Sequence, residues 1–164
     1  VQFALGRDFT VLHDGTKLEV LGGNERFPGL ENVGGNIYHI YTMWSSIHVV
    51  TDKGLLSFGN NRHGQLLGND FAGKFEAVDV GSEHGLGLVG DKVYAWGGGE
   101  HGNCGVERRE EGHEDFEVKN EEGDVKGTIT KAMESFKPNI LFKITGKSAS
   151  LYGGCATSWV VQHL

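Results

Sequence analysis

Short runs of apolar residues, each followed by a glycine-rich turn, recur along the whole chain. Typical runs are LLSF at 55–58 and VYAW at 93–96. Runs of four to eight residues that are rich in β-branched or aromatic side chains and bounded by glycine are typical of β-strands. The pattern therefore predicts an all-β fold of short antiparallel strands.

The strand pattern is also periodic. Three similar segments, each with a polar turn, an apolar alternation and a glycine-rich turn, begin at Val11, Val49 and Leu88. Gly22, Gly59 and Gly97 hold the same place in them, at separations of 37 and 38 residues. Self-similarity at such a period is the signature of a repeat architecture.

A fourth, partial copy stands near the end of the chain. GGCATSWVV from Gly153 matches GSEHGLGLV from Gly81 after a shift of 72 residues. The excess over one period predicts an insertion at 106–138, which holds the acidic run ERREEGHEDFEVKNEEGD at 107–124. Because this run has few apolar residues and no clear period, we expect a flexible, solvated loop between strands. ITKAMESF at 129–136 is long enough for only one short helix, outside the repeat.

Each copy supplies hydrophobic strands that cannot bury both faces of their sheet alone. Neighbouring copies must cover them, and closure into a ring removes the sheet edges that would otherwise aggregate. The repeats are thus expected to form β-propeller blades with four-stranded antiparallel sheets. The predicted turn glycines, which allow positive φ and close backbone approach, are Gly22, Gly59, Gly64, Gly97 and Gly102.

Composition narrows the possible functions. The 164 residues include 27 glycines, in keeping with many tight turns, and the formal net charge of −7 disfavours direct binding to nucleic acid. No apolar stretch is long enough for a membrane span, so no membrane partner is expected. The two cysteines, Cys104 and Cys155, cannot build a disulfide framework and are expected to be free thiols.

Candidate catalytic and metal-binding residues are sparse. The eight histidines include no pair at zinc-ligand spacing. GGGEHG at 97–102 lacks the lysine and hydroxyl residue of a phosphate-binding loop and matches the repeat turn GNNRHG at 59–64. No nucleophile has a visible base partner. We therefore expect a binding protein without metal or cofactor, and not an enzyme.

The strongest binding candidates lie in loops that should gather on one rim of a propeller. Exposed aromatic residues there make good interface anchors. The predicted partner-binding residues are Trp44, His84, Glu100, His101 and Trp159. Core packing is the rival role: it is the expected role for Trp96, inside VYAW, whereas Trp44 fits either role equally well. His84 also fits a structural role, bonding loop backbone.

Two strings, WSSIHVVTDKGLLSFGNNRHGQL and GSEHGLGLVGDKVYAWGGGEHGNCG, resemble the repeat of the regulator of chromosome condensation family. The resemblance covers nearly the whole chain outside the insertion and implies a seven-bladed propeller. Residues 1–164 would then be the C-terminal part of one propeller domain and supply about three blades. The remaining, N-terminal blades are expected from another segment, as a separate chain or fragment.

Four strings resemble more narrowly a fungal group, the alpha-tubulin suppressors or killer-toxin-insensitivity proteins: MWSSIH at 43–48, GSEHG at 81–85, WGGGEHGNCG at 96–105 and GGCATSW at 153–159. That resemblance implies a cytoplasmic and nuclear scaffold that binds a small CSL-type zinc protein. The scaffold would serve diphthamide biosynthesis and Elongator-dependent tRNA wobble-uridine modification. The alternative, from the wider family, is a guanine nucleotide exchange factor for a Ran-like small GTPase.

Overall fold

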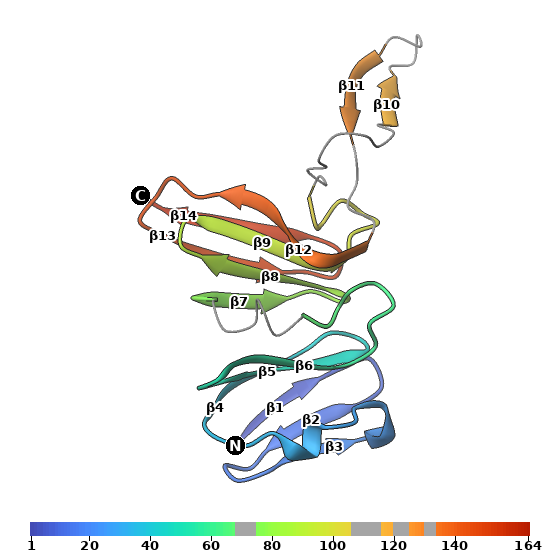
Figure 1. Ribbon diagram of the computed structural model, residues 1–164, viewed down its shortest axis with the longest axis vertical. Coiled ribbons are helices and arrows are strands. Elements are labelled where there is room, and N and C mark those ends of the chain that lie inside the picture. The colour runs from blue at the N-terminus through green and yellow to red at the C-terminus, as the bar shows by residue number, and fades with distance from the viewer. Residues whose placement is uncertain (68–74, 106–115, 120–124, 130–133) are drawn as a thin grey trace.

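The computed structural model describes residues 1–67, 75–105, 116–119, 125–129 and 134–164, and within them the fold is all-β without an α-helix. The first sheet holds β1 (Gln2–Leu5), β2 (Thr10–His13) and β3 (Leu18–Leu21). The second holds β4 (Ile37–Thr42), β5 (Ser46–Thr51) and β6 (Gly54–Gly59). Figure 1 shows these two sheets in its lower half.

Two further sheets follow in the upper half of Figure 1. One is four-stranded in the order β12-β9-β8-β7, with β7 at Ala77–Val80, β8 at His84–Val89, β9 at Lys92–Gly98 and β12 at Glu134–Lys143. The last is the hairpin of β13 (Ser148–Gly153) and β14 (Ser158–His163). All pairings are antiparallel, and the arrangement is that of successive propeller blades.

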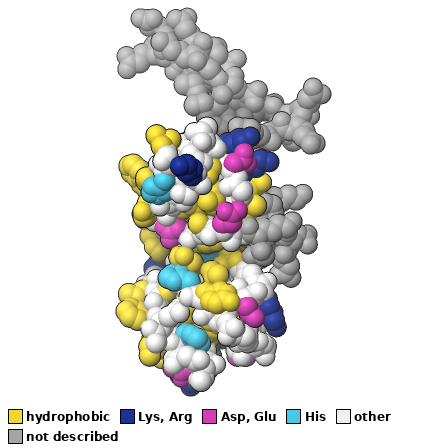
Figure 2. All heavy atoms as spheres, turned by 90° about the vertical axis from the view of Figure 1, so that its left-hand side faces the viewer, with side chains coloured by type: hydrophobic (Ala, Val, Ile, Leu, Met, Phe, Trp, Pro, Cys, Tyr) yellow, Lys and Arg dark blue, Asp and Glu magenta, His cyan; other side chains and the backbone are white. Residues whose placement is uncertain are grey.

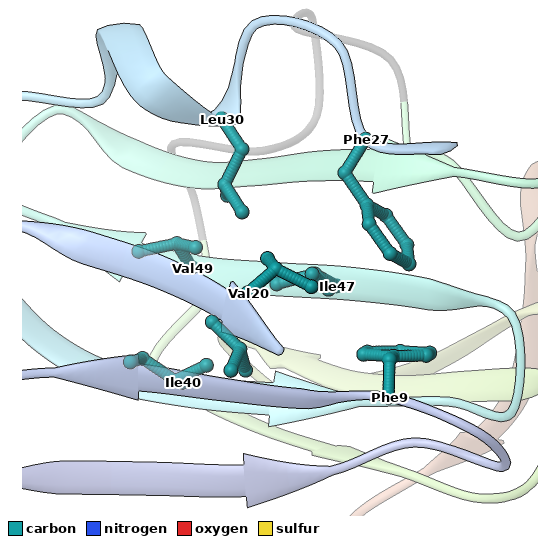
Figure 3. Packing of buried hydrophobic residues seen from close by; sticks show 8 residues of the cluster. Phe9, Val20, Phe27, Leu30, Ile40, Ile47 and Val49 are labelled. Atoms are coloured by element: carbon teal, nitrogen blue, oxygen red, sulfur yellow. The ribbon is translucent and has the colours of Figure 1, made fainter. Parts of the chain in front are cut away.

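The prediction of four strands in every blade is correct for only one sheet within the described residues. After β3 the chain forms two short 3-10 helices, η1 (Asn24–Arg26) and η2 (Leu30–Asn32), where a fourth strand would follow. Figure 3 shows Phe27 and Leu30 from this segment pointing into the core beside Ile47. The first blade is therefore covered by two hydrophobic side chains in place of an outer strand.

The predicted insertion at 106–138 needs correction at its end and in its structure. β12 begins at Glu134 and pairs with β9, so the last five residues of that range belong to the blade and not to a helix. β10 (Phe116–Lys119), within the acidic run, and β11 (Val125–Ile129), directly after it, form an antiparallel hairpin that stands off the blade (Figure 1). Residues 106–115, 120–124 and 130–133 lie outside the described residues.

Three hydrophobic clusters fill the seams between successive sheets. The first joins the β1–β3 and β4–β6 sheets, with Val11 and Ile47 fully buried. The second lies between β4–β6 and the four-stranded sheet, around Trp96. The third packs Leu86 and neighbours against Leu151 of β13. Since apolar burial contributes about 25 cal/mol per Å², the blades stabilise one another through these seams.

Each blade enters its second strand through the same two-residue turn. The backbone N–H before the turn donates to the carbonyl after it: Gly6 to Phe9 at 2.9 Å, Met43 to Ser46 at 3.0 Å, Gly81 to His84 and Gly154 to Thr157 at 2.8 Å. The equivalent of Gly81 is thus Gly154, one residue beyond the match predicted at Gly153. The sequence match aligned glycine letters, whereas strand register is fixed by turn length.

The four turns are linked across the seams by backbone hydrogen bonds. Arg7 N–H donates to the carbonyl of Trp44 at 3.2 Å, Trp44 N–H to that of Ser82 at 2.6 Å, and Ser82 N–H to that of Cys155 at 3.2 Å. All four residues hold the first position of their turn. We call this series the rim relay, because it joins one end of the four blades in order.

The repeat glycines fit tightly against these same turns. Gly22, Gly59, Gly64, Gly97 and Gly102 all have positive φ. A Cβ on Gly97 would lie 2.5 Å from the carbonyl oxygen of Glu83, and one on Gly59 would lie 2.5 Å from that of Ser45. The following N–H groups, of Gly98 and Asn60, donate to those same carbonyls. Glycine is required there for both conformation and space.

We predict that Gly97→Ala lowers the free energy of unfolding by more than about 3 kcal/mol, because positive φ and a backbone clash act together. Gly102→Ala is the matched control: its φ of +81° is similar, but its Cβ meets nothing within 4 Å among the described residues. The control should cost only ~1–2 kcal/mol. Urea denaturation measures both, and equal losses would contradict the close-approach argument.

Candidate functional site

The predicted binding residues meet at the end of the blades that carries the rim relay. A hollow of about 220 Å³ there is lined by Trp44, Glu83, Glu100, His101 and Asn103, among others. We call it the first hollow. Trp44 comes from the turn between β4 and β5, Glu83 from the turn between β7 and β8, and the others from the loop after β9. Turns from two neighbouring blades therefore form one concave surface.

A second hollow adjoins the first. It occupies about 540 Å³ between the loop after β9, β12 and β14, and its apolar lining includes Leu141, Phe142 and Trp159. His101 and Asn103 line both hollows. The structure thus brings Trp44, Glu100 and His101 together, and Trp159 lies at the far side of the second hollow.

Glu83 is held by side chains of the preceding blade. Its carboxylate accepts hydrogen bonds from Ser45 Oγ at 2.9 Å and from Gln65 Nε2 at 2.9 Å. Gln65 is fully buried, and its backbone carbonyl accepts a hydrogen bond from Trp96 Nε1 at 3.2 Å. These contacts fasten the loop after β6 to the next blade and fix one wall of the first hollow.

His84, another predicted partner-binding residue, lines the first hollow, but its side chain is only 1% exposed. Its Nε2 lies 3.0 Å from Ser158 Oγ, and Ser158 Oγ in turn donates to the carbonyl of Asn103 at 2.7 Å. Burial lowers the pKa of His84, which favours the neutral ring. His84 supports the floor of the first hollow from below and joins two blades.

The other candidates are accessible. Trp44 is 47% exposed and Trp159 is 64% exposed, whereas Trp96 is completely buried, as predicted. Glu100 Oε1 and His101 Nε2 lie 3.3 Å apart, an ion pair when the imidazole is protonated, and the two side chains are 68% and 64% exposed. Such an exposed pair contributes little stability. Its members are free to exchange this contact for one with a binding partner.

Trp159 lies on a different kind of surface from Trp44. It is opposite Tyr152 in the β13–β14 hairpin, and both side chains are exposed. Val160, the next residue of β14, packs toward the third cluster. Trp159 therefore belongs to the open face of the last hairpin as well as to the edge of the second hollow.

Sequence reasoning missed Asn103, although it is central to the site. Its side chain is 7% exposed, and its Nδ2 donates to the carbonyl of Gly98 at 2.7 Å. Its Oδ1 has no hydrogen-bond partner among the described residues. A buried acceptor without a donor is unfavourable and uncommon. No local pattern marks it, because its surroundings come from separate turns.

Metal and phosphate chemistry find no support in the described residues. No group of three or more histidine, cysteine or acidic side chains is placed to hold a metal ion within them. The glycines of GGGEHG form a turn in which Gly102 N–H donates to the carbonyl of Gly99 at 2.9 Å.

Both cysteines are free, and burial raises the pKa of the Cys104 thiol to about 12. No helix in the described part has the length and apolarity to cross a bilayer.

The opposite end of the blades has a different character. Figure 2, which views the left-hand side of Figure 1, shows basic, acidic and histidine side chains intermingled with hydrophobic ones. Asp91 and Lys143, in and beside the β8–β9 turn at this end, form a salt bridge at 3.1 Å. A surface of mixed charge gives no single sign for a partner to recognise.

Comparison with known proteins identifies the fold. No family model and no curated protein matches the chain. Prp20p from Saccharomyces cerevisiae, whose structure was reported with its binding properties to Gsp1p and histones, is 19% identical over 99% of this chain and 43% of its own, with a TM-score of 0.63. Human WBSCR16 is 20% identical over 98% of this chain and 45% of its own, with a TM-score of 0.59.

These likenesses show that the chain has the fold of part of a regulator of chromosome condensation propeller. The chain spans less than half the length of the two propellers it matches. Within the described residues, four successive sheets carry the same two-residue turn.

We predict that Trp44→Ala changes the free energy of unfolding by less than about 1 kcal/mol, because half of the ring already faces solvent. Trp96→Ala should cost about 3–5 kcal/mol, since it opens a cavity in the second cluster and removes the bond to Gln65. Thermal and urea unfolding of the two variants measure the difference. A Trp44→Ala loss as large as that of Trp96→Ala would place Trp44 in the core.

Proposed function

We propose that this chain is part of a protein-binding propeller scaffold, without catalytic activity of its own, whose partner docks on the relay end of the blades. The observation that carries the proposal is the convergence there of Trp44, Glu100 and His101 beside two adjoining hollows. Exposed tryptophan next to polar groups is the composition that interface centres favour.

The partner that the sequence favours is a small CSL-type zinc protein. The resemblance of MWSSIH, WGGGEHGNCG and GGCATSW to the fungal alpha-tubulin suppressors supports this choice, together with the exposure of Trp44 within the first string. On this proposal the scaffold works in the cytoplasm and nucleus, where it serves diphthamide biosynthesis and Elongator-dependent modification of wobble uridine in tRNA.

A further propeller segment is the second proposed partner. Phe3 and Leu5 of β1 are about two-thirds exposed, and so is Trp159 of β14. Apolar sheet faces of this kind are covered in propellers by the neighbouring blade. We therefore assign Trp159 first to contact with a further blade, and the docking of the zinc protein to Trp44, Glu100 and His101.

Nucleotide exchange on a Ran-like GTPase is the competing function. The fold likeness to Prp20p, a protein studied for its binding to Gsp1p, makes it worth testing directly. At the two hollows the relay end is concave, which is not the shape of a wedge that opens a nucleotide site. Accelerated nucleotide release by the propeller would replace the scaffold proposal.

The proposal predicts that Trp44→Ala, in the propeller that contains this chain, weakens capture of the CSL-type zinc protein by at least about tenfold, as expected for an interface anchor. The matched control is Tyr38→Ala, which also removes an exposed aromatic ring, but one that lies on β4. Isothermal titration calorimetry gives the affinities, and circular dichroism confirms folding. Equal affinity of the two folded variants would remove Trp44 from the interface.

A further inference from the structure

The first hollow presents a carboxylate and an aromatic ring. The Glu100 side chain is exposed, and its Oε1 lies 3.3 Å from His101 Nε2. Trp44 lines the same hollow. Asn103 belongs to the lining as well, but its Oδ1 is buried and is not offered to a ligand. A ligand that supplies N–H donors and positive charge is complementary to the carboxylate and the ring.

The size of the first hollow limits what enters it. Its volume of about 220 Å³ is below the ~300–1,000 Å³ typical of sites for drug-sized ligands. A single side chain projecting from a protein segment is the appropriate scale.

Among side chains, arginine fits this lining best. Its planar guanidinium carries five N–H donors and no acceptor, and it stacks on aromatic faces while it bonds to carboxylates. Lysine offers a point charge without a stacking plane. Aspartate and glutamate are excluded, because Glu83 and Glu100 both line the hollow and would repel them.

We propose that the first hollow is an arginine-binding site, which receives one arginine side chain from an extended segment of the protein partner. The inference rests on the proposed function, since it names the chemistry by which that partner is recognised. The guanidinium stacks on Trp44 and donates to the Glu100 carboxylate.

The test uses the tripeptide acetyl-Gly-Arg-Gly-amide as probe and the indole N–H signal of Trp44 as reporter in ¹H–¹⁵N NMR. The signal should shift saturably with the arginine peptide. It should shift much less with the citrulline peptide, which has the same shape without the charge. An equal response to citrulline would overturn a charge-dependent site, and an equal response to lysine would overturn the assignment to arginine.

Glu100→Gln should weaken binding of the arginine peptide by about threefold or more, in line with an exposed charge pair. Glu19→Gln is the control, because Glu19 is an exposed acid on β3 that pairs with Lys17 at 3.5 Å, away from the hollow. Both side chains are exposed, so both variants should fold. Unchanged binding by Glu100→Gln would contradict the proposal.

The outcome separates this inference from the function on which it rests. Dependence of zinc-protein capture on Trp44, without peptide binding, would reject the arginine site and retain the docking surface. Peptide binding without any effect of Trp44→Ala on capture would retain the arginine site and reject the proposed partner.

Discussion

The geometry of this molecule depends on one constraint. Each two-residue turn must fit against the third strand of its own blade and also against the turn of the next blade. Within a blade, the carbonyl of Ser45 or Glu83 accepts an N–H at the end of the third strand, where only glycine leaves room. Between blades, the rim relay joins Arg7, Trp44, Ser82 and Cys155. Buried polar backbone must be paired, so these bonds fix how one blade follows another.

The candidate site follows from that constraint. The relay holds the backbone of Trp44 against Ser82, and Glu83 then reaches back to Ser45 and Gln65 of the preceding blade. The rim is therefore a rigid surface and not a set of independent loops. Preorganised surfaces lose little entropy when they bind, which suits the proposed docking function.

Local chemistry explains what could be predicted from sequence. Short-range sequence pattern is enough to predict the repeat period, the positive φ of Gly59 and Gly97 and the burial of Trp96. The strands flanking 120–124 were missed, because charge masks their alternation. The burial of His84 and the role of Asn103 depend on contacts between turns far apart in sequence. The choice of partner and the absence of catalysis stay predictions.

Hydrogen exchange of the turn amides tests the rim relay most directly. The amides of Trp44 and Ser82 lie in surface turns, yet each donates across a seam. They should exchange at least about 100-fold more slowly than the amide of Gly15, in the hairpin turn between β2 and β3, because opening them requires separation of two blades. Exchange as fast as that of Gly15 would show that the blades are not joined by these bonds.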